Sequence, residues 1–144
     1  MVLFFCIIFA SCKSNDPADY RDAYAGTYAG NVTWTSNSIP YTFSEPDIIV
    51  GKSTSSNNEM TIYALFTNGI LDSNGNILSA PGIPEQVTIT VANDGSFTGA
   101  FTSIIAGASI KTTVDGNFLK GALKYEFSSA YWANTFTVDA TKIN

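Results

Sequence analysis

The chain has 144 residues, carries a formal net charge of −5 and contains no histidine. Without histidine, no imidazole is present to activate a serine or cysteine nucleophile, to act as a general base or to complete most zinc sites. The seven basic residues are scattered along the chain, which argues against a nucleic-acid-binding surface. We therefore expect no metal ion, no other cofactor and no nucleic-acid partner.

The first eleven residues form a short apolar segment that ends in small side chains. An apolar run of about nine residues is too short to span a bilayer as a helix, and small residues after such a run are typical of a secretory signal. Phe9-Ala10-Ser11-Cys12 resembles the lipobox of bacterial lipoproteins. The resemblance implies cleavage before Cys12 and acylation of its sulfur and new amino group. No Lys or Arg precedes the apolar run, so either the true start lies upstream or the amino terminus alone supplies the usual positive charge.

We divide the chain into a signal peptide (1–11), a polar tether (12–23) and a single domain (24–144). The tether begins with Lys13-Ser14-Asn15-Asp16-Pro17, a composition typical of loops. Cleavage also removes Cys6, so the mature chain has no cysteine pair for a disulfide. Each buried methylene of an acyl chain adds about 0.8 kcal/mol to membrane binding, so two or three chains anchor a protein stably. We expect attachment to the outer membrane of a Gram-negative bacterium, facing either the periplasm or the cell surface.

After the tether, apolar and polar residues alternate with a period of two, the pattern of antiparallel strands with one buried face. The clearest such segments are Tyr28–Thr35, Val87–Ala92, Ser96–Thr102, Ile110–Val114, Asn117–Phe127 and Phe136–Thr141, with shorter candidates at Tyr41–Phe43, Ile48–Val50 and Met60–Phe66. The dipeptides Asp94-Gly95 and Asp115-Gly116 are turn signals between adjacent strands. Roughly eight strands in meander order predict an all-β fold, either an antiparallel up-and-down barrel or a β-sandwich.

The first predicted strand begins with Ala25-Gly26-Thr27-Tyr28-Ala29-Gly30-Asn31-Val32. Its Gly-x-Tyr-x-Gly stretch, placed directly after a lipoprotein tether, resembles the start of calycin-like (lipocalin-like) β-barrel lipoproteins of Gram-negative bacteria. The resemblance implies an eight-stranded barrel, for which binding of a small apolar ligand is a frequent interpretation.

Aromatic residues are the main candidates for a binding site, because ligand pockets are mostly apolar. The alternation places eight of them on the inner face: Tyr28, Trp34, Tyr41, Phe43, Phe97, Phe101, Tyr125 and Phe136. An eight-stranded barrel either is filled by its side chains or holds one small ligand, and the sequence does not separate these cases. Our candidate ligand contacts are Trp34, Phe43, Phe101 and Tyr125, together with Tyr131 and Trp132 of a predicted loop, which are adjacent and cannot both face one core.

None of the twelve acidic residues falls on a predicted buried face, so we expect no carboxylate pair for glycoside hydrolysis and no enzymatic activity. We predict a membrane-anchored domain that binds a small apolar ligand or a protein partner of the envelope. Two alternatives stay open. One is a carbohydrate-binding β-sandwich, and the other is a structural or assembly subunit that uses Met60–Phe66, which is apolar on both faces, as an exposed edge strand.

Overall fold

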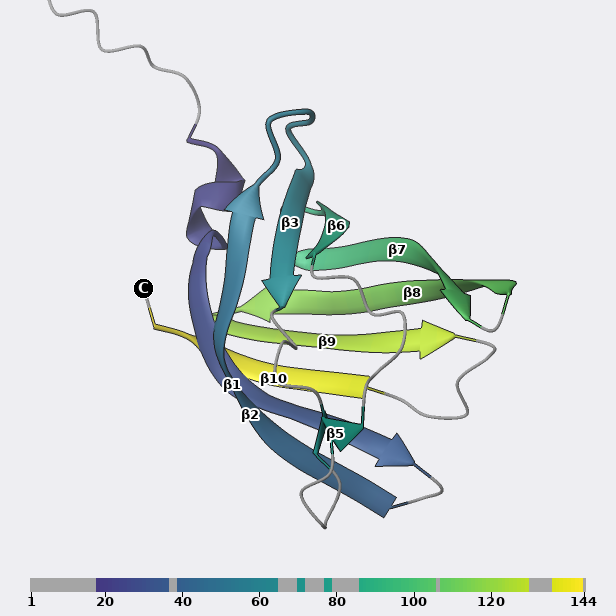
Figure 1. Ribbon diagram of the computed structural model, residues 1–144. Helices are drawn as coiled ribbons and strands as arrows, with labels where there is room; N and C mark the ends of the chain where they lie inside the picture. Colours follow the sequence, from purple (N-terminus) through teal and green to yellow (C-terminus); the bar gives the residue numbers. More distant parts are fainter. Residues whose placement is uncertain are drawn as a thin grey trace, which may run out of the picture.

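The computed structural model describes residues 18–36, 39–64, 70–71, 77–78, 86–105, 107–129 and 136–143. Most of them lie in β-strands that follow one turn of 3-10 helix (Figure 1). The elements are η1 (Tyr20–Ala23), β1 (Gly26–Ser36), β2 (Ile39–Lys52), β3 (Glu59–Ala64), β4 (Ile70–Leu71), β5 (Ile77–Leu78), β6 (Gln86–Val91), β7 (Ser96–Ile105), β8 (Ala108–Leu119), β9 (Ala122–Ser129) and β10 (Phe136–Lys142).

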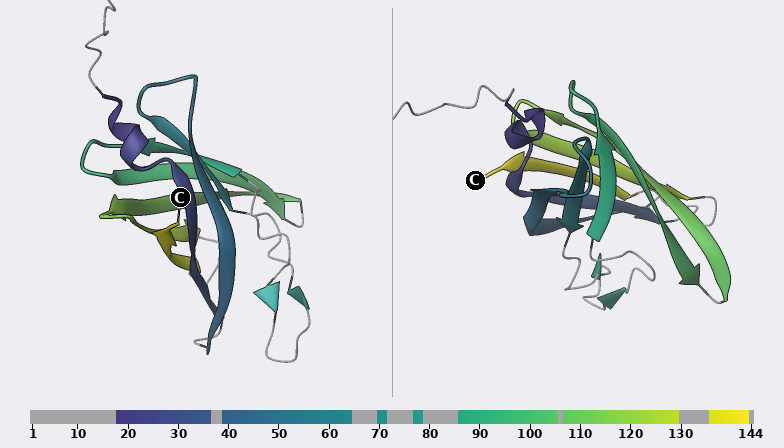
Figure 2. Two further views of the ribbon diagram at one scale, coloured as in Figure 1. Left: turned by 90° about the vertical axis from the view of Figure 1, so that its left-hand side faces the viewer. Right: turned by 90° about the horizontal axis from the view of Figure 1, so that it is seen from above.

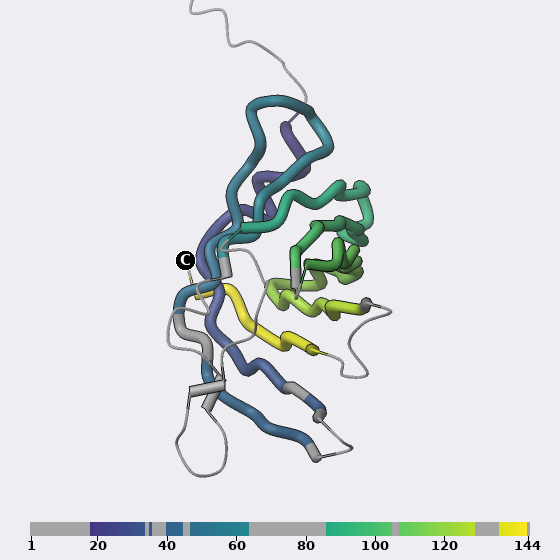
Figure 3. Tube along the Cα trace, turned by 45° about the vertical axis from the view of Figure 1, so that its right-hand side comes forward, coloured from purple at the N-terminus to yellow at the C-terminus, as the bar shows by residue number. Residues whose placement is uncertain are grey.

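Eight strands close into one antiparallel barrel in the order β1-β10-β9-β8-β7-β6-β3-β2. The first and last strands close the barrel, with Val32 of β1 opposite Val138 of β10. Strands β4 and β5 pair only with each other, as a small sheet inserted between β3 and β6. Figure 3 follows the wall from β1 through β10, β9 and β8 to β7, and Figure 2 shows it from two further sides. The expected all-β, up-and-down barrel is confirmed, and the alternative β-sandwich is not formed.

The alternating segments place their apolar side chains inside the barrel, as predicted. In β6 every second residue is buried, namely Val87, Ile89 and Val91, and the residues between them are exposed. The same alternation runs through Phe136, Val138 and Ala140 of β10. The two-residue periodicity of apolar residues therefore predicted correctly which face of these strands is buried.

The turn between β8 and β9 is not where the sequence predicted it. Asp115 and Gly116 lie within β8, and the chain instead reverses at Lys120 and Gly121, whose φ angles are 49° and 82°. Two successive residues with positive φ are characteristic of the tight turns that join hairpin strands. The Asp-Gly dipeptide was therefore a wrong turn signal at this position, whereas Asp94-Gly95 does lie in the turn between β6 and β7.

Gly116 does not form a turn. It allows atoms of the neighbouring strands to lie close to its backbone within the barrel wall. A Cβ atom added to it would lie 2.5 Å from Cζ of Phe97 and 2.6 Å from Cβ of Tyr125, so no larger residue fits there. The later turn also changes which residues face inward. Phe118 is buried, whereas Leu119, which the alternation within Asn117–Phe127 would place on the same face as Tyr125, is 61% exposed.

The segment predicted as Met60–Phe66 forms an internal wall strand over its described part. Strand β3 pairs with β2 on one side and with β6 on the other. Met60 and Ile62 are buried in the core, and Tyr63 points outward with 38% exposure. Over Glu59–Ala64 the chain therefore does not present the open edge that strand addition by an envelope partner would need.

Helix η1 belongs to the stretch expected to be a tether, yet it packs against the barrel. Its Arg21 is only 6% exposed. Arg21 Nη1 donates hydrogen bonds to two backbone carbonyl oxygens of the connection between β2 and β3, those of Ser53 (3.2 Å) and Ser56 (2.6 Å), and to that of Glu59 (2.9 Å), the first residue of β3. Its Nη2 donates to Oδ2 of Asp19 at 2.8 Å. Hydrogen bonding from Arg21 holds the pKa of Asp19 well below its ordinary value.

Other side chains join η1 to further parts of the barrel. The Tyr20 hydroxyl donates to the carbonyl oxygen of Val91 at 2.8 Å, and the Tyr24 hydroxyl donates to that of Asn93 at 3.0 Å. Lys142 Nζ, at the end of β10, donates to the carbonyl oxygen of Ala23 at 3.1 Å. Helix η1 is thus bonded to the β2–β3 connection, the β6–β7 turn and β10, and it covers one end of the barrel.

Candidate ligand-binding site at the open end of the barrel

The two ends of the barrel differ in construction. At the closed end, η1 lies beside the connections 53–58, 92–95 and 120–121. At the opposite end, which we call the open end because η1 does not lie there, are the last residues of β1, β3, β7 and β9 and the first residues of β2, β6, β8 and β10. In Figure 1 the closed end is at the upper left, and the open end lies toward the right and the bottom.

The closed half of the interior is a packed aromatic core. Phe118 lies at its centre, with ring centroids 5.0 Å from Phe97, 5.0 Å from Tyr24 and 6.1 Å from Tyr28. Tyr28 is 1% exposed, and its hydroxyl donates to the carbonyl oxygen of Tyr24 at 2.7 Å. Burial raises the pKa of Tyr28 to about 12, because the phenolate would lose its hydration there. This half therefore has the close packing of a folding core.

The open half is also lined by aromatic rings, but part of the lining is accessible. Phe127 makes edge-to-face contacts with Tyr125, Phe101 and Phe136, at centroid distances of 5.3, 5.9 and 6.5 Å. Tyr125, Phe127 and Phe136 are each at most 5% exposed. Phe101 and Phe43, on the same inner face, are only partly buried and pack against the core. The aromatic wall thus extends from the sealed interior to a partly exposed rim.

Two hydroxyl groups interrupt the apolar inner wall in this half. Ser103 and Thr112 are buried, with 9% and 5% exposure. Thr112 of β8 lies directly opposite Phe101 of β7, and Ser103 is two residues beyond Phe101 on the same strand. Residues opposite each other or two apart share a face of the sheet, so both hydroxyls belong to the inner face. A mostly apolar wall with a few polar groups is the usual composition of a small-molecule site.

The structure brings three of the six predicted ligand contacts into this wall: Phe43, Phe101 and Tyr125. Trp34 lies in β1 opposite Tyr41 and Phe136, and its side chain is outside the description. Tyr131 and Trp132 fall in the connection from β9 to β10, which is not among the described residues. Cys12, the predicted acylation site, is not described either.

Sequence reasoning missed Ser103, Thr112 and Phe127 as candidate contacts. The signal for the two hydroxyls was present, because each continues the inward set of its strand, after Phe101 in β7 and before Val114 in β8. A polar residue at an inward position is unusual enough to mark a site. Phe127 lies two residues after Tyr125 and shares its face by alternation, but it was not among the predicted inward aromatics, and its contact with Phe101 depends on strand pairing that the sequence did not specify.

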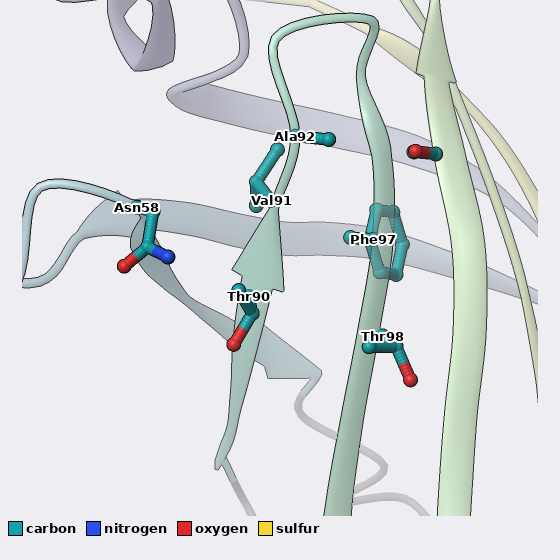
Figure 4. A pocket seen from close by; sticks show the side chains of 7 residues that line it. Asn58, Thr90, Val91, Ala92, Phe97 and Thr98 are labelled. Carbon is teal, nitrogen blue, oxygen red and sulfur yellow. The ribbon is translucent and has the colours of Figure 1, made fainter.

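The outer wall carries two shallow depressions. The first lies at the β6–β7 hairpin and is lined by Asn58, Thr90, Val91, Ala92, Ser96, Phe97 and Thr98 (Figure 4). The second crosses β1, β8, β9 and β10, where the exposed acidic residues are Asp115, Glu126 and Asp139. Lys124 Nζ pairs with Asp139 Oδ2 in the second depression at 2.8 Å. Within the described ranges, no group of three acidic or cysteine side chains is placed to hold a metal ion.

No protein-family model matches the chain, and no curated protein matches it. Among solved structures it is similar to a crystal structure described as a "putative outer membrane protein" from Bacteroides fragilis, with a TM-score of 0.48 and 17% sequence identity. The match covers 86% of this chain and 52% of that one, so the chain spans about half of that protein's length. None of the helices in the described segments is long and apolar enough to cross a membrane. The function proposed below is argued from the chain's own residues.

Proposed function

We propose that this protein is a lipid-anchored, non-catalytic binding protein of the bacterial outer membrane that takes a small apolar ligand into the open half of a calycin-like barrel. The observation that carries the proposal is the inner wall of that half. It joins a partly exposed aromatic rim at Phe43 and Phe101 to buried rings at Tyr125 and Phe127. Aromatic rings that are partly exposed on an inner face offer apolar area that a ligand can cover.

The wall also indicates the chemistry of the ligand. Most of its contacts would be made with carbon, because the lining is aromatic. The hydroxyls of Ser103 and Thr112 are able to donate and to accept hydrogen bonds, so they suit one polar group and need no charge on it. No basic or acidic side chain is among the buried inward residues of the described open half. The site therefore favours an apolar molecule with a single uncharged polar group, a hydroxyl or a carbonyl.

The proposed lipid anchor rests on the lipobox at Cys12. The polar surface of the outer wall supports it. Outward positions of three consecutive barrel strands are polar and exposed, namely Asp115, Asn117, Lys124, Glu126, Thr137 and Asp139. A wall with this surface is suited to water, so membrane attachment would come from acylated Cys12. Helix η1 begins eight residues after Cys12, which places the closed end next to the anchor.

Binding is tested with the mature chain carrying Cys12→Ser, which removes the acyl chains, and a fluorescent fatty-alcohol analogue as the probe. Phe101→Ala is expected to weaken binding about tenfold, because loss of roughly 1.5 kcal/mol of apolar contact corresponds to that factor. The matched control is Ile104→Ala in the same strand. Ile104 is 80% exposed and points outward, so its replacement should leave the affinity unchanged. Equal weakening by both variants, or no binding to the parent chain, would refute an internal site.

A further inference from the structure

Apolar side chains exposed on the outer wall gather toward the closed end of the barrel. The described residues include five large apolar side chains that are exposed, and four of these lie on the closed-end side: Ile49 (43%), Tyr63 (38%), Leu119 (61%) and Ile143 (52%). We call these four residues the collar. The fifth is Ile104, which is 80% exposed near the tip of β7 at the open end.

Three members of the collar are close neighbours on the sheet. Ile49 of β2 lies directly opposite Tyr63 of β3, and on its other side it lies opposite Thr27 of β1. The backbone N–H of Ile143 donates to the carbonyl oxygen of Thr27 at 2.8 Å. A row of outward positions thus runs from Ile143 across Thr27 to Ile49 and Tyr63.

Leu119 extends the collar along the same end of the barrel. It is the last residue of β8, directly before the turn at Lys120 and Gly121. The backbone N–H of Lys142 donates to the carbonyl oxygen of Gly121 at 2.7 Å, which brings that turn beside the end of β10. Leu119 and Ile143 therefore lie at the same end of β8 and β10, on either side of β9.

The chain that leads to the predicted anchor departs from this end. Asp19, the N-cap of η1, lies seven residues after Cys12, so the segment between them spans at most about 25 Å when fully extended. Arg21 fixes η1 to the β2–β3 connection and to the first residue of β3 through three hydrogen bonds. Strand β8, with its 12 residues, is roughly 40 Å long, so the far end of the barrel lies beyond the reach of this segment.

The charges at the closed end also suit a lipid surface. Lys120 and Lys142 lie beside Leu119 and Ile143, where they can approach anionic headgroups. Asp22 forms an ion pair with Lys52, and Asp19 forms one with Arg21, whereas the exposed Asp94 in the β6–β7 turn of the same end accepts hydrogen bonds from Ser96. Protein surfaces that lie in a membrane interface combine exposed apolar side chains with basic side chains.

We propose that the collar lies in the interface of the membrane that holds acylated Cys12, so that the open end of the barrel faces away from the lipid. This orientation depends on the proposed anchor. It brings the closed end into contact with the bilayer and leaves the binding site free to exchange ligand with the aqueous side. Tyr63 is the interfacial aromatic residue of the collar, with a ring that is partly exposed and a polar hydroxyl.

The orientation is tested with acylated protein in vesicles of phosphatidylcholine containing a minor fraction of phosphatidylglycerol. Because acylation occupies Cys12, the variants Leu119→Cys, Ile143→Cys and Ile104→Cys each provide one free thiol for an environment-sensitive fluorophore. Labels at 119 and 143 are expected to shift to shorter emission wavelengths and to be quenched several-fold more strongly by spin-labelled lipid than the label at 104. The protein mass and flotation with the vesicles are measured on the same samples.

Each outcome is decisive. Stronger quenching at 104 than at the collar, in protein that is acylated and floats, would overturn the orientation and leave the anchor intact. Protein that is unmodified at Cys12 and does not float would overturn the anchor, and the orientation with it. A third arm uses the labelled chains with Cys12→Ser in buffer. A shift of the collar labels there would identify a second copy of the chain, instead of lipid, as the occupant of the collar.

Discussion

Replacement of Arg21 by alanine is expected to lower the melting temperature by about 10 °C, because several hydrogen bonds of about 1 kcal/mol each would be lost from a domain of this size. The guanidinium joins three backbone carbonyl oxygens, two in the β2–β3 connection and one at the start of β3, to the carboxylate of Asp19. Alanine leaves these acceptors without their donor and removes the side chain that fixes η1. Hydrogen exchange should then rise selectively in residues 53–58 and in η1.

Arg21→Lys is the matched control for this prediction. Lysine keeps the positive charge but lacks the planar fork that reaches the carbonyl oxygens and Asp19 together. Its melting temperature should lie between those of the parent chain and the alanine variant. An alanine variant that melts with the parent chain, with unchanged exchange in residues 53–58, would show that η1 is not fixed to the barrel through Arg21.

Gly30→Ala is expected to destabilise the barrel by about 3 kcal/mol, at the upper end of ordinary overpacking, because the added atom has no space. Gly30 of β1 lies opposite Ala140 of β10, on the seam that joins the first and last strands. A Cβ atom there would overlap the carbonyl oxygen of Asp139 and lie 2.6 Å from Cβ of Ala140. The contact includes backbone, so the two strands would have to separate.

Gly51→Ala is the matched control, since it makes the same chemical change in a neighbouring strand. A Cβ atom at Gly51 would lie 3.7 Å from Cε2 of Tyr63, which is an ordinary contact distance. The variant should be neutral or slightly stabilised, because alanine loses less backbone entropy on folding than glycine does. Urea unfolding of both variants measures the difference. Equal stability of the two would contradict the close approach of β1 and β10.

Much of the fold was predictable because two-residue alternation records which face of a strand is buried. It placed Val87, Ile89 and Val91 correctly, and the same pattern held in β10. The β8–β9 turn was not predictable in this way. An Asp-Gly dipeptide favours a tight turn locally, but Gly116 is required by the closeness of Phe97 and Tyr125, which only the assembled barrel creates.

The candidate site was predictable in its aromatic part and not in its polar part. Alternation alone places Phe43 and Phe101 inward. The position of Thr112 and Ser103 beside Phe101 follows instead from the β7–β8 register. Sequence patterns also did not predict the role of η1. Arg21 stands in a polar segment typical of a tether, and its carbonyl partners come from a connection more than thirty residues later.

Mass spectrometry of the protein purified natively from a Gram-negative host, first intact and then after release of bound molecules, tests the anchor and the binding site together. We predict that Cys12 is the first residue and carries acyl chains, and that an apolar molecule with one polar group accompanies the folded chain. We further predict that this molecule is lost from Phe101→Ala and retained by Ile104→Ala. An unmodified Cys12 would contradict the anchor, and a folded parent chain with no bound molecule would contradict the binding site.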